Sequence, residues 1–284
     1  MLAGNQFLFV GAGNIAESIM KGLLSTEQIR PGEIWVTNRS NTQRLQFLRQ
    51  YYGIVPVTDK KAAASEANII VLAIKPQDVF SVLAELKDSI TENHLIISVL
   101  AGITTTLIED TLGIKVPVVR AMPNTSCAVL ESATGLTSGQ YVSPEQLELA
   151  KEIFTIVGEV VVFDEELLDA VTGLSGSGPA YIYYLVEAME KAGEATGIPR
   201  ELARPLVLKT LIGAARMLIE TGENPEVLRK QVTSPNGTTM AGLKELERYN
   251  FQQAIEHAVV SATNRSKELG QQYVQNDAKK SANF

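Results

Sequence analysis

The sequence predicts an α/β protein, with a doubly wound sheet and covering helices over residues 1–164 and an all-helical domain over residues 165–284. Two observations lead to this prediction. In the first 160 residues, short apolar runs alternate with amphipathic stretches, which is the pattern of parallel βαβ units. From about Glu165 the strand pattern stops and long helical patterns take over.

Eight apolar runs in the first part are predicted as strands. Most are rich in Val and Ile, and the run at 69–74 is apolar throughout, as expected of a strand that is covered on both faces. The predicted strands are residues 6–10, 34–37, 54–57, 69–74, 95–99, 116–120, 135–137 and 160–163, of which the last two have the weakest pattern. Helical patterns lie between them at 15–24, 42–51, 79–89, 105–112 and 144–157.

The second part is predicted as helices at 166–171, 180–196, 199–221, 225–231, 240–248 and 251–269. Pro199 and Pro225 suit first helical turns. These helices are rich in Leu, Ile, Val and Ala but cannot enclose a large core alone, so we expect them to form a subunit interface. The polar last dozen residues are predicted to be a frayed tail.

Composition limits the partners of the protein. Lys and Arg number 25 against 32 Asp and Glu, and this net charge of −7 disfavours a nucleic-acid partner. The apolar run at 69–74 is far shorter than the roughly 18 to 20 residues that span a bilayer. The first ten residues lack the basic region and cleavage site of a signal peptide. We therefore expect a cytoplasmic protein with no membrane partner.

The reactive side chains are few. Cys127 is the single cysteine, which excludes an intrachain disulfide and a cysteine-based metal cluster, and we predict no metal site. His94 and His257 are the only histidines, which leaves little for a mechanism based on a histidine general base. We predict structural roles for these three residues and for Trp35.

A glycine-rich segment follows the first predicted strand and opens the first helix. This order of strand, tight turn and helix is that of a dinucleotide fingerprint, although a βα turn with small residues for packing alone is the alternative. Gly11 permits a sharp turn, Gly13 lets a pyrophosphate approach the main chain, and Ala16 allows close packing of helix on strand. The predicted cofactor-binding residues here are Val10, Gly11, Ala12, Gly13, Asn14, Ile15 and Ala16.

The end of the second strand favours NADPH, with NADH as the alternative. An NAD site has Asp or Glu at this position, to bind the ribose 2′-hydroxyl. This chain instead has Asn38 and Arg39, and a guanidinium can pair with a 2′-phosphate. The alternative for Arg39 is a solvated surface charge.

Residues directly after the next two strands are also candidates, because ligands of doubly wound sheets lie at the carboxyl ends of the strands. They are Ala73, Ile74, Lys75 and Pro76 after the fourth strand, and Val99, Leu100 and Ala101 after the fifth. Lys75 could donate to a ribose hydroxyl or to the nicotinamide amide, and a loop lysine in water is equally compatible with the sequence.

Three further polar segments are candidate substrate sites. Met122, Pro123 and Asn124 follow the sixth strand, where a plain Pro-Asn turn is the alternative. Ser175, Gly176 and Ser177 precede a long helix, and we expect their N–H and hydroxyl groups to receive a carboxylate at its N-terminus, with a flexible linker as the alternative. Thr238 and Thr239 follow a Pro-Asn-Gly turn and begin another helix, which alone would indicate only an N-cap.

Together these motifs resemble the pyrroline-5-carboxylate reductase family, NADPH-linked enzymes that make proline. The resemblance runs along nearly the whole chain, through GAGNIA at 11–16, AIKP at 73–76, RAMPNT at 120–125, SGSGPAY at 175–181 and VTSPNGTT at 232–239. It implies an N-terminal Rossmann domain and a C-terminal helical domain that forms a homodimer, often with five dimers in a decamer. It departs at Asn236, where the family usually has glycine. Because Asn tolerates a left-handed conformation, we expect the loop to survive.

The resemblance also implies site residues. Asn38 and Lys60 would lie near the adenosine phosphate, and the loops at 73–76 and 99–101 near the ribose and nicotinamide. Glu165, Gln231, Thr238 and Thr239 would lie near the small-molecule substrate, 1-pyrroline-5-carboxylate, or the product, proline.

The implied reaction needs little acid catalysis, because a cyclic imine can arrive protonated and simply accept hydride. Thr239, whose hydroxyl could hydrogen-bond the ring nitrogen, and Lys75 are the candidate catalytic residues. A β-hydroxyacid dehydrogenase is a rival interpretation, but it needs a catalytic lysine, and the helix after SGSGPAY offers only Lys191, far from its start. A non-catalytic NADPH-binding protein is a third, which the serine- and threonine-rich donor loops disfavour.

Overall fold

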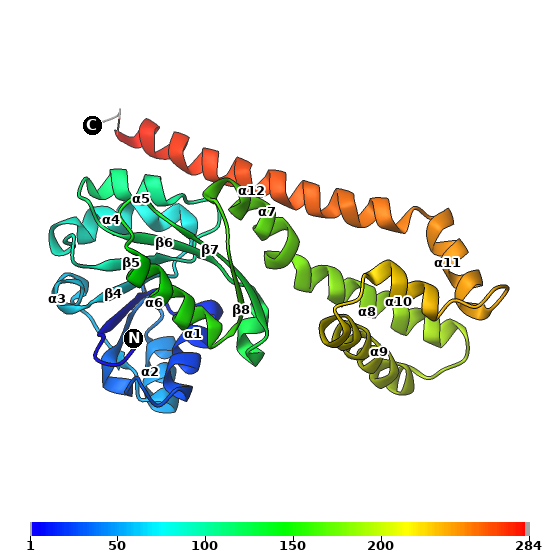
Figure 1. Cartoon of the computed structure of the whole chain (residues 1–284). Coiled ribbons are helices and arrows are strands. Elements are labelled where there is room, and N and C mark those ends of the chain that lie inside the picture. The colour runs from blue at the N-terminus through cyan, green and yellow to red at the C-terminus, as the bar shows by residue number, and fades with distance from the viewer. Residues whose placement is uncertain (1, 282–284) are drawn as a thin grey trace. The chain divides into compact units, whose positions relative to one another are not determined.

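The computed structural model describes the backbone of residues 2–281 and the side chains of residues 2–275 (Figure 1). Its contacts divide the chain into two compact units. Unit 1 comprises the residues up to Ser177 together with those from Val260 onward, and unit 2 comprises residues 178–259. The last helix, α12 (Phe251–Ser281), begins in unit 2 and ends in unit 1.

Unit 1 is built on an eight-stranded sheet in the order β3-β2-β1-β4-β5-β6-β7-β8. The strands are β1 (Phe7–Val10), β2 (Ile34–Thr37), β3 (Val55–Pro56), β4 (Ile69–Leu72), β5 (Leu95–Ser98), β6 (Val118–Met122), β7 (Ser132–Ser138) and β8 (Gly158–Val162). β1 lies in the middle, with Phe7 opposite Ile34 of β2 and Ile69 of β4. The chain reverses its strand order at β1 and β4, which is the switch point of a doubly wound sheet.

Helices cover both faces of this sheet (Figure 1). They are α1 (Asn14–Ser25), α2 (Thr42–Tyr52), α3 (Lys60–Glu66), α4 (Val79–Leu86), α5 (Thr105–Leu112), α6 (Pro144–Thr155) and the short α7 (Leu168–Val171). In β1, Phe7 and Phe9 belong to the core cluster under α1, α2 and α6, whereas Leu8 and Val10 belong to the cluster under α3, α4 and α5. Successive side chains of a strand point to opposite faces, so a strand covered on both sides is apolar at every position.

Unit 2 contains α8 (Gly178–Ala195), α9 (Arg200–Thr221), α10 (Pro225–Gln231), α11 (Thr238–Arg248) and the first part of α12. Glu190 of α8 has 1% of its surface exposed and accepts hydrogen bonds from Arg200 Nε at 3.0 Å and Arg204 Nε at 2.6 Å. The bond from Arg204 is the main cause that holds the pKa of this carboxyl below its ordinary value. These ion pairs join α8 to α9.

Unit 2 has almost no apolar core of its own. Within residues 178–259, only Ala203 and Val207 are buried hydrophobic residues. Along α9, by contrast, Leu202, Leu206, Ile212 and Ile219 are between 49% and 81% exposed. Exposed apolar surface on this scale marks an interaction site.

The predicted fold class is confirmed, but three elements differ from the prediction. β7 runs antiparallel to β6, so the sheet is mixed. The helix α3 was not predicted, although Asp59 caps it by accepting a hydrogen bond from Ala62 N. α12 continues to Ser281, so the predicted frayed tail is wrong for residues 273–281, and residues 282–284 lie outside the described part.

The compact units also divide the chain elsewhere than at the predicted boundary between residues 164 and 165. Residues 165–177 pack on the sheet, where Asp169 pairs with Arg120 of β6 and Asn124 binds Ser175. Contacts therefore keep this segment with unit 1 although its secondary structure is helical.

The residues predicted to be structural fit that role. Cys127 is 1% exposed, and burial raises the pKa of its thiol, which suits a packing residue. His94 is buried, accepts a hydrogen bond from Thr91 N, and places Nε2 2.9 Å from Ala64 O. Trp35 packs partly buried against the second cluster, and His257 is exposed on α12.

Within the described residues, no helix is both long and apolar enough to cross a membrane.

Candidate active site

Four predicted segments, the glycine-rich turn and the ends of β2, β4 and β5, meet at the carboxyl edge of the sheet. Gly11 N donates to Thr37 O at 2.9 Å, which joins the glycine-rich turn to the end of β2. Ala73 N donates to Val10 O at 2.9 Å, and Val99 N donates to Leu72 O at 3.1 Å. The ends of β2, β1, β4 and β5 are thus held side by side by main-chain hydrogen bonds. In doubly wound sheets this edge is where a dinucleotide binds.

The glycine-rich turn has the shape of an anion-binding cradle. Gly11 has φ +115°, and a Cβ there would lie 2.2 Å from Ala73 O, so no other residue fits without displacing β4. Gly13 is the N-cap of α1, which has no side-chain cap. A Cβ at Gly13 would meet no atom within 4 Å. The first turn of α1 therefore faces open space, which suits a pyrophosphate.

Most of the predicted cofactor residues offer main chain rather than side chain to this edge. Val10, Ala12, Ala16 and Leu100 are buried in the two core clusters. Ala73, Ile74 and Val99 pack partly buried against the same clusters, and Ile15, Pro76 and Ala101 are half-buried. Asn14 is exposed at the start of α1, and Lys75 is exposed directly before the short turn Pro76–Asp78.

The residues predicted to lie at the adenosine end differ in how freely their side chains can bind. Arg39 is 88% exposed, with Nη1 only 3.6 Å from Asp78 Oδ1. Asn38 instead shapes its own loop, because its Nδ2 donates to Asn41 O and its Oδ1 accepts from Asn41 N. Lys60 Nζ donates to Glu85 at 2.8 Å. Arg39 is thus the most accessible cation of this group.

A network below the glycine-rich turn was missed by the sequence analysis. Arg44 of α2 donates from Nε to Ala12 O at 2.9 Å and from Nη2 to Glu17 of α1. Tyr52 Oη donates to the other oxygen of Glu17 at 2.8 Å. Burial alone would raise the pKa of Glu17, but the hydrogen bonds from Arg44 and Tyr52 hold it below its ordinary value. The network fixes α1, α2 and the main chain of the turn together.

Two predicted substrate loops also meet in unit 1. Asn124, after β6, donates from Nδ2 to Ser175 O at 3.1 Å, and a Cβ at Gly176 would lie 3.3 Å from Met122 Cε. Pro123 is buried between its neighbours Met122 and Asn124. The segments RAMPNT and SGSG are therefore in contact although some 50 residues separate Asn124 from Ser175.

The long helix α8 begins at Gly178, directly after the segment 175–177, but part of that segment also continues the preceding helix. Thr172–Gly176 form a π-helical turn that continues α7, and Ser177 N donates to Thr172 O at 2.8 Å. The hydroxyl of Ser175 donates to Val171 O at 3.1 Å. The Ser175 hydroxyl and the Ser177 N–H are thus used within the chain, because a widened turn lets the helix continue through residues 172–176. Such π turns occur frequently at functional sites.

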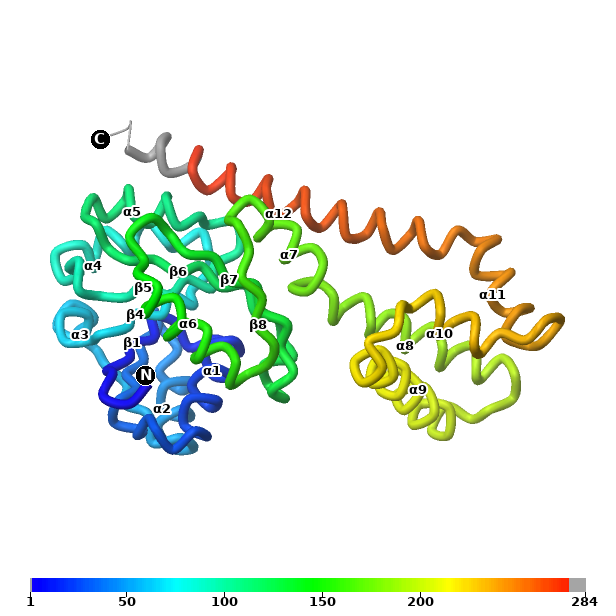
Figure 2. Tube along the Cα trace, viewed as in Figure 1, coloured from blue at the N-terminus to red at the C-terminus, as the bar shows by residue number. Residues whose placement is uncertain are grey.

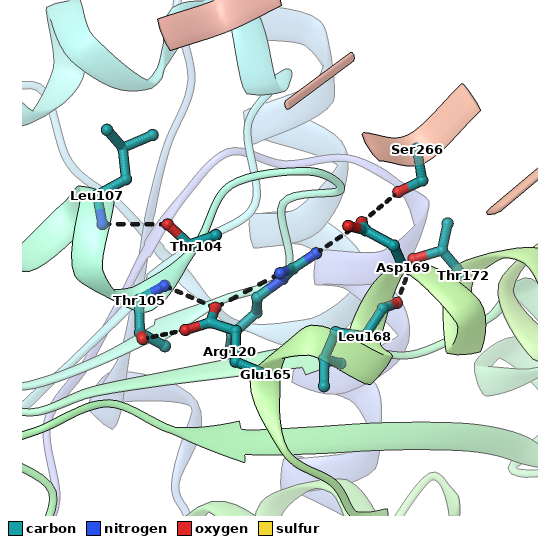
Figure 3. A network of polar contacts seen from close by, with 9 residues as sticks. All are labelled: Thr104, Thr105, Leu107, Arg120, Glu165, Leu168, Asp169, Thr172 and Ser266. Atoms are coloured by element: carbon teal, nitrogen blue, oxygen red, sulfur yellow. Dashed lines mark hydrogen bonds and ion pairs between the residues drawn. The ribbon is translucent and has the colours of Figure 1, made fainter. Parts of the chain in front are cut away.

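Figure 3 shows a buried ionic network that holds residues after 164 on the sheet. Arg120 of β6 is 1% exposed and lies 3.4 Å from both Glu165 and Asp169. Glu165 also accepts hydrogen bonds from Thr105 N at 2.8 Å and from the Thr105 hydroxyl. Asp169 accepts from Ser266 Oγ of α12 at 2.7 Å. Two carboxylates thus face one buried guanidinium, which needs a counter-charge because it is buried.

This network changes the interpretation of Glu165. Its oxygens bind Thr105 and Arg120, whereas the resemblance implied a place near the substrate. A polar cavity of about 730 Å³ nevertheless opens beside it, lined by Thr137, Ser138 and residues 162–167. In the sequence, the one sign of this network is Arg120, a charged residue in an otherwise apolar strand.

The predicted substrate residues of unit 2 lie on one loop and its flanking helices. Gln231 ends α10, and Thr238 and Thr239 begin α11, all exposed. Asn236 has φ +59°, and Gly237 N donates to Ser234 O at 3.0 Å to close the turn. The expectation that Asn236 accepts a left-handed conformation is confirmed.

Comparison with known proteins decides the family. Pyrroline-5-carboxylate reductase 1 of Bacillus spizizenii is 47% identical to this chain over 261 residues, which cover 92% of this chain and 88% of that protein. The chain belongs to the pyrroline-5-carboxylate reductase family. The family profile for pyrroline-5-carboxylate reductase dimerisation matches residues 165–269, and the profile described as NADP oxidoreductase, coenzyme F420-dependent, matches residues 6–102.

Solved structures of this family have the same fold. The pyrroline-5-carboxylate reductase of Coxiella burnetii has a TM-score of 0.86 at 41% identity, covering 93% of this chain and 98% of that one. The pyrroline carboxylate reductase of Plasmodium falciparum, solved with NADP bound, has a TM-score of 0.85 at 28% identity, covering 94% of this chain and 98% of that one. Family membership favours the reductase over the β-hydroxyacid dehydrogenase.

We predict that Glu17→Gln lowers stability near neutral pH by about 1–2 kcal/mol, or roughly 2–4 °C in melting temperature, because charged hydrogen bonds from Arg44 and Tyr52 are weakened. The pKa of Glu17 is lowered by folding, so its stabilisation is complete above the ordinary value of 4.5 and is lost as pH falls through the lower folded value. The gap between variant and wild type should therefore close in acid.

Thermal unfolding of both proteins across pH 3 to 7 measures this gap. Glu148→Gln is the control, because it removes an exposed partner of Lys151 and should change stability little. A gap of constant size over the whole pH range would contradict the role of the Glu17 charge.

Proposed function

We propose that this chain reduces the cyclic imine 1-pyrroline-5-carboxylate to L-proline with NADPH, the final step of proline biosynthesis. Its membership of the pyrroline-5-carboxylate reductase family supports this activity. The observation that carries the proposal is the meeting of the glycine-rich turn with the ends of β2, β4 and β5 at one edge of the sheet. These are the loops that we assign to the pyrophosphate, the ribose and the nicotinamide.

We assign the cofactor to this edge. The turn at 10–16 would hold the pyrophosphate, Asn38, Arg39 and Lys60 the adenosine phosphate, and the loops at 73–76 and 99–101 the ribose and nicotinamide. The open space at Gly13 and the exposed Arg39 support the assignment. NADPH is proposed rather than NADH because β2 ends without a carboxylate that would repel a 2′-phosphate. The NADP-bound relative from Plasmodium falciparum agrees with this choice.

We assign substrate contacts to the polar segments at 122–124, 175–177 and 238–239 and to Glu165 and Gln231. Their motif resemblance to the family supports this assignment. Uncharged donors such as Ser and Thr hydroxyls can orient a carboxylate by hydrogen bonds, without adding a charge to the site. The contact between Asn124 and Ser175 gives the first two segments a fixed relative position.

NADPH, when bound, supplies the hydride for the C=N bond. The work of the chain is to orient the imine, since a protonated imine needs no strong acid. Thr239 would donate a hydrogen bond from its hydroxyl to the ring nitrogen or accept one from a protonated ring nitrogen. Lys75 would hold the cofactor from its exposed position after β4 by donating to a ribose hydroxyl or to the carboxamide.

The first prediction is that purified protein consumes NADPH when 1-pyrroline-5-carboxylate is added and forms NADPH from NADP and proline at alkaline pH. No nucleotide consumption with the imine would contradict the proposed function.

Thr239→Val keeps the size of the side chain but removes the hydroxyl, and we expect kcat/KM to fall more than about tenfold. Thr239→Ser, which keeps the hydroxyl, should retain most of the activity; a fully active Thr239→Val would exclude the role of Thr239.

A second prediction concerns Arg39. Arg39→Asp places a negative charge where we assign the 2′-phosphate, so the ratio of kcat/KM for NADPH over NADH should fall by about tenfold or more. Asp78→Asn is the matched control, because it removes the carboxylate near Arg39 but leaves the guanidinium. An unchanged ratio in Arg39→Asp would remove this residue from the site.

We further propose that the protein is a cytoplasmic homodimer formed through the helices of unit 2, with a decamer of five dimers as the larger assembly. The match to the dimerisation profile and the exposed apolar side chains of α9 support the dimer. The decamer and the compartment rest on the family resemblance and on the composition.

Sedimentation should detect a dimer or larger species at micromolar concentration. Leu206→Glu introduces a charge at a residue that is 62% exposed in the single chain, and it should shift the protein toward monomer if this face is buried between copies. Glu220→Ala is a control on the same helix. A monomeric wild-type protein would contradict the proposed dimer.

A further inference from the structure

The end of α12, which belongs to unit 1, packs on the rest of that unit through one face made of Ser266, Gly270 and Tyr273, which we call the α12 contact face. The spacings of four and three residues place these side chains on one side of a helix. Ser266 Oγ donates to Asp169 at 2.7 Å, and Tyr273 packs partly buried against the core cluster that contains Leu100 and Ile103. Figure 2 traces α12 as one continuous helix up to its last described turns.

The centre of the contact face meets the loop after β5 at main-chain distance. A Cβ at Gly270 would lie 2.4 Å from Gly102 O, and a Cβ at Gly102 would lie 2.9 Å from Gly270 N. Gly102 also has φ +73°, a conformation that side chains rarely adopt. The helix and the loop can therefore touch only because both positions are glycine.

Gly102 lies directly beside a loop that we assign to the cofactor. Val99 N is fixed on Leu72 O, and Leu100 and Ile103 are buried, so the loop between them has little freedom to adjust. On its other side the loop leads into α5, whose first residue, Thr105, is held by Glu165. Glu165 and Asp169 share Arg120, so the beginning of α5 and α12 are connected through one buried guanidinium (Figure 3).

We propose that the α12 contact face is a positioning element for the β5–α5 loop, and that it sets the affinity of the enzyme for its nicotinamide cofactor. The proposal rests on the proposed function, which assigns residues 99–101 to the ribose and nicotinamide. None of the residues of the face is assigned to the cofactor or to the substrate. They act by fixing Gly102, which holds the main chain at Ala101 and Val99 in place before the cofactor binds. Binding then does not have to order this loop, which would reduce the affinity.

Gly270→Ala tests this contact. Alanine favours a helix interior, so α12 itself is not weakened, while the new methyl group must move Gly102 O away. We expect KM for NADPH to rise about fivefold or more, with kcat at saturating NADPH and KM for the imine within about twofold of wild type. Lys267→Ala, an exposed position on the same helix, is the control and should leave all three constants unchanged.

Ser266→Ala is a second, milder variant that keeps the proposal testable if Gly270→Ala does not fold. It removes the hydrogen bond to Asp169 and should raise KM for NADPH about two- to threefold, and Ser266→Thr should restore the wild-type value because it keeps the hydroxyl. Circular dichroism and melting temperature establish that each variant is folded.

The outcomes separate the two proposals. A wild-type protein that does not reduce the imine overturns the proposed function. An active wild type together with a folded Gly270→Ala or Ser266→Ala variant that has an unchanged KM for NADPH overturns the role of the contact face. Equal increases in KM for NADPH and for the imine would also overturn it, because a general loosening of the fold would affect both substrates alike.

Discussion

The close approach of Gly11 to the carbonyl of Ala73 is the constraint on which the rest of the candidate site depends. A side chain at this position would come within 2.2 Å of that oxygen. Because the position is glycine, the turn after β1 lies against the end of β4 while its N–H bonds to Thr37 at the end of β2. The three loops then form one continuous edge, and α1 begins there without a side-chain cap. The chemistry assigned to this edge is a consequence of backbone geometry more than of particular side chains, as the burial of Val10, Ala12 and Leu100 also indicates.

A second constraint is the burial of Arg120. A guanidinium that is 1% exposed needs compensating charges, and the sheet itself supplies none beside it. Glu165 and Asp169 provide them from the segment that follows β8. Loss of Arg120 would leave both carboxylates without their cationic partner, so the segment after residue 164 is bound to the sheet by ion pairs as well as by apolar contact. This explains why residues 165–177 belong to unit 1 by their contacts although they begin the helical half of the sequence.

Much of the fold and part of the site could be predicted from the sequence, and the reason lies in the range of the interactions. Strand periodicity and the strand–turn–helix order around Gly11 are local, so the sheet, its switch point and the cofactor loops were predictable. The antiparallel β7, the π turn at 172–176 and the extension of α12 are decided by partners far along the chain, such as Gly102 for Gly270 and Asn124 for Ser175. The ion-pair partners of Arg44 and Arg120 could not be predicted for the same reason. The local sequence around an arginine does not show which carboxylate it contacts in the fold.

The distribution of charge agrees with a reaction in which the substrate itself carries the charged groups and the protein mainly orients it. In unit 1 the ionised groups nearest the assigned loops are largely paired: Arg120 with Glu165 and Asp169, Arg44 with Glu17, and Lys60 with Glu85. The two histidines lie elsewhere, His94 in a buried turn and His257 exposed on α12. The residues assigned to the substrate offer mainly hydroxyl, amide and main-chain groups. A site of this kind has no strong acid to give, and it suits an imine that is already protonated and carries its own carboxylate, for which accurate orientation is the main requirement.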